Sequence, residues 1–288
     1  IALCAGAGRP TVLDIPNGFA RGVRAASDFL MALQLTGAAK RESIANLQIR
    51  LPVVVIGGGL TAIDTATESL AYYAVQVEKF LSRLETLGEE PAWNAEERGI
   101  AQEFIAHARA LRAARPEARL ALLKSWGGVT IAYRRRLVDS PSYTLNHEEV
   151  EKALEEGVSF AEGLTPTRID VDEYGHASAV RFSSEGKEVR LPARSVLIAA
   201  GTQPNTVLAR EEGVSLASNL PPARPFVGFV DERSPRLGCR GRRLRCGSAR
   251  ARRRRSRPRR CCTRRRRRRR GRSEERRGGK EGWWAWGG

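Results

Sequence analysis

The sequence has no long apolar run and almost no cysteine before its last fifth. None of its 288 residues belongs to a stretch of about 18 consecutive apolar residues, the length that a membrane-spanning helix needs. Cys4 is the single cysteine of residues 1–235, which argues against a disulfide framework and fits a reducing compartment. We therefore expect a soluble, cytoplasmic protein without a membrane partner.

Acidic residues are scarce at the C-terminal end of the chain. Residues 236–288 hold 23 Arg, one Lys and three Glu, a net charge of +21. Because the whole chain carries +18, residues 1–235 carry −3. The positive charge that would favour nucleic-acid binding therefore belongs to the C-terminal segment alone.

The C-terminal segment, residues 236–288, also lacks Val, Ile and Phe. It cannot form a core, and we expect a disordered Arg-rich tail. Such low complexity is typical of a GC-rich gene translated out of frame, and residues 272–281 resemble a translated library adaptor. We interpret the tail as a frameshift near Pro235 followed by adaptor read-through. The alternative function is nucleic-acid binding through the tail, which the lack of aromatic residues within its Arg runs disfavours.

The cysteines of the tail provide no Cys-x-x-Cys pair. Adjacent cysteines are poor partners in a tetrahedral zinc site. We therefore expect no metal.

A glycine-rich turn follows a short apolar run. Val53–Ile56 is β-branched throughout, as buried parallel strands are. The turn and the next residues match the Gly-x-Gly-x-x-Ala form of the dinucleotide fingerprint, in which small residues permit the tight turn, the approach of the pyrophosphate and close helix packing. A Gly-rich turn without a ligand is the alternative. The candidate cofactor-binding residues are Gly57, Gly58, Gly59, Leu60, Thr61 and Ala62.

Apolar residues recur at helical spacing after the turn and predict one long amphipathic helix over residues 61–87. Glu78 lies where an NAD-type site would place its ribose-binding carboxylate. It falls inside the helix, however, on the polar face, so we interpret it as a solvated helix charge. A second helical pattern over residues 94–115 predicts a helical hairpin inserted within residues 72–125.

A second strand is predicted over residues 127–133, and three arginines, residues 134–136, follow it at once. Guanidinium groups at the end of the second strand are placed to hold a 2′-phosphate in the bidentate geometry that arginine allows. This pattern favours NADPH over NADH. A solvated basic loop is the alternative.

The rest of the pattern continues to alternate strands and helices, which predicts an α/β fold. We expect a helix over residues 147–156, a strand over 158–161 and an antiparallel meander over 167–191. A last buried strand begins at residue 195 and ends at Gly201, where the absence of a side chain lets the backbone lie against a nucleotide or flavin.

The three histidines are His107, His147 and His176, and none of them has a catalytic partner pattern. We expect all three to be structural or solvated.

Four stretches, residues 53–64, 129–135, 155–158 and 196–205, together resemble the two-dinucleotide flavoprotein family of FAD-dependent pyridine nucleotide oxidoreductases. Within it they are most similar to the branch of the glutamate synthase small subunit. The resemblance implies a Rossmann-like doubly wound parallel sheet that binds NADPH at the fingerprint, with Arg134 and Arg135 on the 2′-phosphate. It also implies FAD as a second cofactor and transfer of hydride from NADPH to flavin and on to an unidentified acceptor, such as an electron-acceptor protein.

In that family the NADPH domain is inserted into the FAD domain. By resemblance, residues 1–21 end a truncated FAD-binding segment, 22–205 form the NAD(P)H-binding domain, and 206–235 start the returning FAD segment. The candidate flavin-side residues are Ala5, Gly6 and Ala7. The first FAD fingerprint and an initiator Met are missing, so we expect a fragment of a longer protein. The lack of a Cys-x-x-Cys dithiol disfavours the disulfide-reductase branch.

Overall fold

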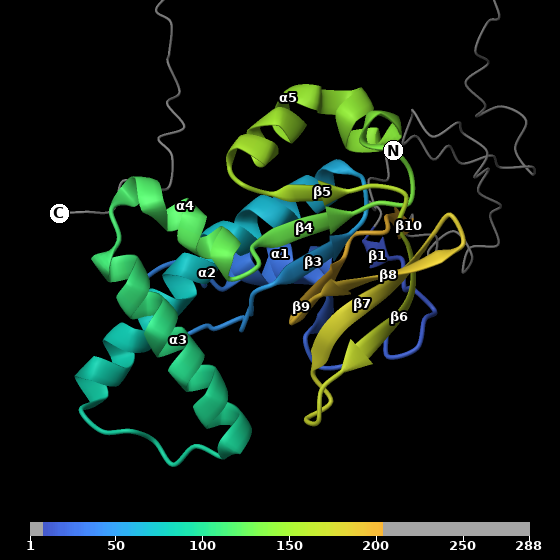
Figure 1. Ribbon diagram of the computed structural model, residues 1–288. Coiled ribbons are helices and arrows are strands. Elements are labelled where there is room, and N and C mark those ends of the chain that lie inside the picture. The colour runs from blue at the N-terminus through green and yellow to red at the C-terminus, as the bar shows by residue number, and fades with distance from the viewer. Residues whose placement is uncertain (1–7, 204–288) are drawn as a thin grey trace, which may run out of the picture. The chain divides into compact units, whose positions relative to one another are not determined.

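A five-stranded parallel sheet forms the centre of the described part of the chain (Figure 1). The computed structural model describes residues 8–203. The sheet has the strand order β2–β9–β3–β4–β5, and every neighbouring pair in it is parallel. The α/β fold with a Rossmann-like sheet is therefore confirmed. The strands are β2 (Val23–Ala25), β3 (Val53–Ile56), β4 (Val129–Ala132), β5 (Ser159–Ala161) and β9 (Ser195–Ile198).

Helices cover one face of the sheet. Side chains of a strand alternate between its two faces, and Val53 and Val55 enter a core to which every one of the five helices contributes. The largest part comes from α2, whose Tyr73 is fully buried. The helices are α1 (Ala26–Leu35), α2 (Leu60–Leu87), α3 (Ala95–Ala113), α4 (Pro116–Ser125) and α5 (Pro141–Glu155).

The antiparallel meander covers the opposite face. Val54 and Ile56 pack there against Ile169 and Phe182 of the meander. The meander consists of β6 (Thr165–Val171), β7 (Ala177–Ser184) and β8 (Lys187–Pro192). The short strands β1 (Arg9–Pro10) and β10 (Thr202–Gln203) form a separate antiparallel pair, and a 3₁₀ turn, η1 (Leu137–Asp139), precedes α5.

Helix α2 is much longer than the strand that precedes it. Its 28 residues span about 42 Å at 1.5 Å per residue, whereas the four residues of β3 span about 13 Å. The helix starts at the carboxyl edge of the sheet and runs back past the amino edge, where it ends at Gly88 with a φ of 78°. Helix α3 then begins with a capping box between Asn94 and Glu97 and packs on α2. The inserted helices therefore lie at the amino end of the sheet.

The insertion and α5 differ in detail from the sequence-based expectations. The insertion contains a further helix, α4, besides the expected helix at residues 94–115. Helix α5 begins at Pro141 and not at His147, because Ser140 caps it and Pro141 takes its first turn. No helix within residues 8–203 is both long and apolar enough to cross a membrane.

Candidate functional site

The fingerprint glycines connect β3 to α2, and the first two are held by protein neighbours. The N–H of Gly57 donates to the carbonyl oxygen of Ala132, at 3.1 Å. A Cβ on Gly57 would lie 2.3 Å from the carbonyl oxygen of Ala199, and a Cβ on Gly58 would lie 2.4 Å from the ring of Tyr133. Both positions therefore exclude a side chain, Gly57 because the backbone after β9 lies close to it and Gly58 because the ring of Tyr133 covers it.

Gly59 is different, because a Cβ there would meet no atom of residues 8–203 within 4 Å. Its φ of −93° is open to any residue, and it is the N-cap of α2, where no side chain caps the helix. Leu60 is half-buried and Thr61 exposed. The first turn of α2 therefore presents backbone N–H groups beside open space, an arrangement that suits a phosphate.

Ala62, the last residue of the fingerprint, lies on the buried face of α2. Its side chain is fully buried and belongs to the core between α2 and the sheet. A larger side chain would push the helix away from β3. The residue thus sets the distance between the helix and the strand.

Arg134 and Arg135 lie at the same edge of the sheet as the fingerprint. Strands β3 and β4 are parallel and in register up to Ile56 and Ala132, so the residues that follow them emerge side by side. The side chains of both arginines are exposed, and no ion pair among residues 8–203 includes either of them. The structure therefore brings two exposed guanidinium groups to the carboxyl edge of the sheet.

Arg136 is engaged elsewhere. Its Nε donates to Asp139 at 2.9 Å, and this hydrogen bond holds the pKa of the Asp139 carboxyl below its usual value, with the charge of Arg135 acting in the same direction. The backbone around these arginines is fixed as well, since the carbonyl oxygen of Arg135 accepts from the N–H of Gly163. Because its guanidinium is already bound, Arg136 is a suitable control position for substitutions of Arg134 and Arg135.

Gly201 lies beyond the carboxyl end of β9, at the same edge again. It has a φ of +98°, which favours glycine, and its carbonyl oxygen accepts from the N–H of Thr11 at 2.9 Å. The N–H of Ala199 donates to Ile56 just before the fingerprint turn. The expected flavin-side residues, Ala5–Ala7, lie outside the described residues, as does the whole tail.

Sequence reasoning missed Tyr133 and Ser142. The ring of Tyr133 covers Gly58, and the N–H of Ser142 donates to the carbonyl oxygen of Gly58 at 3.1 Å. Tyr133 ends the predicted second strand, but its contact becomes visible only when β4 lies beside β3. The two residues hold the turn at Gly58.

Glu78 lies within α2, as expected, and is bound to another helix. Arg112 of α3 donates to both of its oxygens through Nε, at 3.0 and 2.9 Å. Glu78 is therefore a partly exposed helix charge, as expected, but it is also paired with Arg112, which sequence periodicity could not show because it does not place α3 alongside α2. As a helix residue turned towards α3, it is no ribose ligand.

The histidines have structural neighbours. His107 Nδ1 hydrogen-bonds the hydroxyl of Tyr73 at 2.6 Å, and its ring stacks on Trp126 at 3.7 Å. His176 is buried, and His147 lies near the ring of Tyr143. Within residues 8–203, no group of three His, Cys, Asp or Glu side chains is placed to hold a metal ion.

Comparison with known proteins gives matches over most of the described residues. The family described as pyridine nucleotide-disulphide oxidoreductase matches residues 1–220. An uncharacterized protein of Rickettsia prowazekii (strain Madrid E), RP006, is 49% identical over 184 residues, which are 64% of this chain and 26% of that protein. The putative oxidoreductase AegA of Escherichia coli (strain K12) is 31% identical over 104 residues, 30% of this chain and 15% of that protein.

The chain thus spans about a quarter or less of the length of these two relatives. Among solved structures, the ferredoxin reductase for the CYP199A2 system of Rhodopseudomonas palustris is 16% identical, with a TM-score of 0.40. That match covers 74% of this chain and 37% of the reductase.

Proposed function

Because the chain belongs to the pyridine nucleotide-disulphide oxidoreductase family, we propose that it is the NADPH-binding portion of a flavin-dependent oxidoreductase. In this proposal hydride passes from NADPH to FAD and on to an acceptor, for which an electron-acceptor protein is one candidate. The bound nicotinamide and flavin supply the hydride chemistry. The chain's own residues bind and orient the nucleotide.

The observation that carries the proposal is the open space at Gly59. Gly57 and Gly58 are glycines for reasons of packing, whereas Gly59 has no neighbour in the described part of the chain that would exclude a side chain. A bare backbone at this place is useful if a ligand approaches it closely. The uncapped start of α2 supplies N–H donors to the pyrophosphate, as in other dinucleotide-binding helices.

Arg134 and Arg135 support NADPH over NADH. Both side chains are exposed at the carboxyl edge of the sheet, next to the strand that leads into the fingerprint. Arginine holds a phosphate with two parallel hydrogen bonds, and NADPH differs from NADH by a single 2′-phosphate. We assign the recognition of this phosphate to Arg134 and Arg135.

Several finer features belong to the same proposal. The flavin side includes Gly201, a glycine of positive φ whose backbone carries no side chain, together with Ala5–Ala7. Residues 22–205 form the nucleotide domain, flanked by parts of the FAD domain. The branch is that of the glutamate synthase small subunit, on the strength of the stretches quoted above. A cytoplasmic location is supported by the scarcity of cysteine before residue 236.

Calorimetric titration of the chain with NADPH and with NADH tests the proposal. We expect NADPH to bind more tightly, and Arg134→Ala to weaken NADPH about tenfold, the effect of one charge-assisted hydrogen bond, while NADH affinity stays unchanged. The unaltered chain and every variant carry the same Arg-rich tail. Any non-specific attraction of NADPH by the tail is therefore the same in all of them and does not affect the change in affinity caused by a substitution.

Arg136→Ala is the matched control, because that guanidinium is bound to Asp139. It should leave the ratio of the two affinities as it is in the unaltered chain. Equal affinity for NADPH and NADH, or equal losses in Arg134→Ala, would contradict the assignment of the 2′-phosphate. No binding of either nucleotide would overturn the whole proposal.

A further inference from the structure

The far end of α2 borders a pocket of about 340 Å³. The pocket lies between the C-terminal half of α2, the segment before β3 and the loop that leads to α3. Its volume is at the low end of the range for small-molecule sites. Phe80, in the middle of the lining, is 20 residues after Leu60, so it lies about 30 Å along the helix from the fingerprint. The pocket is therefore a separate feature, built mainly by the insertion.

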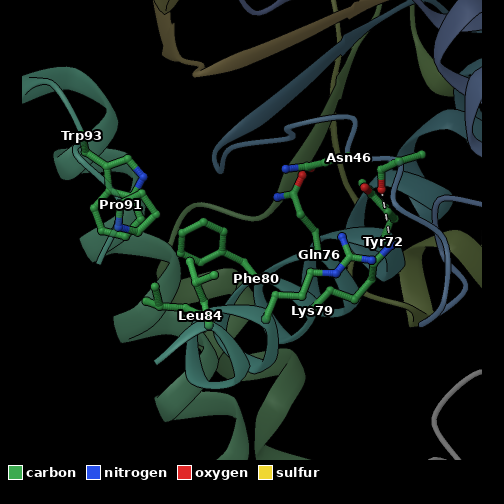
Figure 2. Close-up of a pocket in the computed structure, with 11 residues that line it drawn as sticks. Asn46, Tyr72, Gln76, Lys79, Phe80, Leu84, Pro91 and Trp93 are labelled. Atoms are coloured by element: carbon green, nitrogen blue, oxygen red, sulfur yellow. Dashed lines mark hydrogen bonds between the residues drawn. The ribbon is translucent and has the colours of Figure 1, made fainter. Parts of the chain in front are cut away.

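One side of the pocket is apolar. The ring of Phe80 stacks on the indole of Trp93, with 6.1 Å between centroids and 28° between planes. Figure 2 shows Leu84 and Pro91 beside these rings, while Asn46, Tyr72, Gln76 and Lys79 lie on the other side. Aromatic rings in this arrangement offer a flat surface on which a further ring can pack.

The other side of the pocket carries two cations. Lys79 and Arg83 are four residues apart on α2, and both line the pocket. Lys79 is 8% exposed, and its Nζ donates to the carbonyl oxygens of Ala38, at 2.7 Å, and Ala45, at 3.3 Å. An ammonium group has three donors, so one N–H of Lys79 is left for a ligand.

These two cations have no close carboxylate among the described residues. None of the ion pairs in residues 8–203 includes Lys79 or Arg83. Glu42 is the carboxylate whose charge acts on Lys79, and its side chain is exposed. Like charges at this helical spacing repel each other, and a buried ammonium without a counter-ion is costly.

Tyr72 adds a further donor. Its hydroxyl oxygen accepts from the N–H of Leu47 at 3.1 Å, which leaves the hydroxyl proton free to donate. Gln76, between Tyr72 and Lys79 on the helix, uses its amide on both backbone groups of Ile49. The polar side of the pocket therefore holds donors and positive charge, which lie behind a mostly apolar lining surface. Nη2 of Arg83 also donates to the carbonyl oxygen of Ser43.

We propose that this pocket binds a small molecule that has a flat apolar body and one carboxylate. The ring packs against Phe80 and Trp93, and the carboxylate accepts hydrogen bonds from Lys79 and Arg83. Such a ligand supplies the counter-charge that the described residues lack and fills the apolar side at the same time. The proposal is independent of the nucleotide site, because it uses the opposite end of α2.

Calorimetry with two matched probes tests this proposal on the full chain. Indole-3-acetate carries the ring and the carboxylate, and indole-3-acetamide is its neutral counterpart. We expect the acid to bind about tenfold more tightly than the amide, since it adds charge-assisted hydrogen bonds. Lys79→Met should remove this preference. Trp93→Ala should weaken the binding of both probes.

Lys124→Met is the matched control, because Lys124 is exposed on α4 and does not line the pocket. It should leave both affinities unchanged. Equal affinity of the unaltered chain for acid and amide would overturn the proposal. A preference for the acid that survives Lys79→Met would also overturn it, because binding would then be due to other cations, such as those of the tail.

A second measurement needs no substitution, which matters because Lys79 also holds the carbonyl groups of Ala38 and Ala45. Hydrogen exchange of the unaltered chain is followed with each probe. The acid should slow exchange in residues 72–93 more than the amide does. Protection that is equal for the two probes, or absent from these residues, would contradict the proposal.

Discussion

The three glycines of the fingerprint have different physical roles. Gly57 and Gly58 accommodate the carbonyl group of Ala199 and the ring of Tyr133, respectively. Gly59 accommodates nothing within the described chain. A substitution should therefore have opposite consequences at Gly57 and Gly59.

We predict that Gly59→Ala preserves stability and abolishes nucleotide binding, whereas Gly57→Ala destabilises the fold. The added methyl group at Gly59 meets open space at an ordinary φ but occupies the path of the pyrophosphate. At Gly57 it collides with backbone, and overpacking of this kind costs about 1–3 kcal/mol. Urea unfolding and nucleotide titration of both variants check this. Tight nucleotide binding by Gly59→Ala would refute the assigned role.

The fingerprint residues could be predicted from local sequence, but the residues that pack against the fingerprint turn could not. A strand, a Gly-rich turn and a helix in direct succession identify Gly57–Ala62 without any tertiary information. Tyr133 is 75 residues away from Gly58 in sequence, and their contact depends on the pairing of β3 with β4. Such contacts follow from sheet order, which local patterns do not determine.

His107 should make stability depend on pH. Burial lowers the pKa of His107, and the opposing effect of Glu103 does not outweigh it; Arg194 also lowers this pKa. The folded state therefore favours the neutral ring, so the stabilisation is complete above the unfolded pKa of about 6.5 and is lost as the pH falls through the folded pKa. Urea midpoints measured from about pH 7.5 to 5 should fall, and less so in His107→Gln. The same slope in both proteins would argue against this origin.

At the scale of elements, Glu103 fastens the insertion to the sheet. It accepts from Arg50 at 2.9 Å and from Arg194 at 2.5 Å, two residues that precede β3 and β9. Arg194 also donates to the carbonyl oxygen of Leu51. Helix α3 is therefore bound to the amino ends of two neighbouring strands.

We predict that Glu103→Gln costs about 3 kcal/mol of unfolding free energy, because it leaves the largely buried guanidinium group of Arg50 and the partly exposed one of Arg194 without their carboxylate. The matched variant Glu78→Gln breaks a half-exposed pair with Arg112 and should cost far less. Denaturant unfolding of the two variants measures the difference. Equal losses would show that burial does not distinguish the two contacts.

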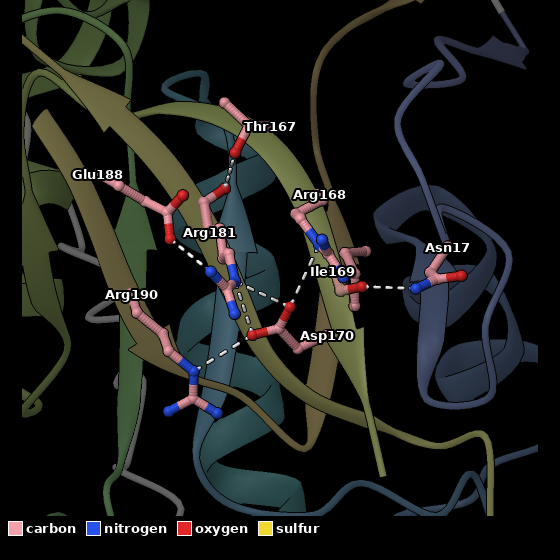
Figure 3. Close-up of polar contacts among 8 residues, drawn as sticks. All are labelled: Asn17, Thr167, Arg168, Ile169, Asp170, Arg181, Glu188 and Arg190. Carbon is pink, nitrogen blue, oxygen red and sulfur yellow. Dashed lines mark hydrogen bonds and ion pairs between the residues drawn. The ribbon is translucent and has the colours of Figure 1, made fainter. Parts of the chain in front are cut away.

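The outer face of the meander is organised around Asp170 (Figure 3). Arg181 and Arg190 donate to this carboxylate, at 2.9 and 3.2 Å. Burial acts to raise the pKa of Asp170, but the hydrogen bonds from these arginines outweigh it, so the pKa is lowered. Asp170 thus joins the three strands on the outer face, while its neighbour Ile169 is buried on the inner one.

The long elements were predictable and the short ones less so. The apolar stripe of α2 gives its length almost to the residue. Helix α4 has a single buried residue, Leu123, so it carries no stripe to recognise. The start of α5 was missed because the helix is kinked at Asn146, which has non-helical φ and ψ angles, and the expected helix is the part after this kink.

At the scale of the whole described unit, α2 joins two sites at opposite edges of the sheet. Its first turn faces the proposed nucleotide site, and its last turns line the proposed carboxylate pocket. Strands β3, β4 and β9 could be predicted from apolar runs, whereas the short β2 was not predicted. The order β2–β9–β3 could not be predicted either, because the paired residues of β2 and β9, such as Val23 and Val196, are 173 apart in sequence.

This strand order also has a consequence for synthesis on the ribosome. β9 lies between β2 and β3 but is made last, so a nascent chain lacks the middle of its sheet until residue 198 has emerged. Until then β2 has no partner within the sheet and β3 has an open edge, and open edges recruit other chains. We predict that ribosome-bound chains resist protease only after β9 has emerged, and resistance of chains that end at Pro192 would contradict this. Emergence of β9, the last strand of the sheet to be made, thus closes the open edges through which a nascent chain would aggregate.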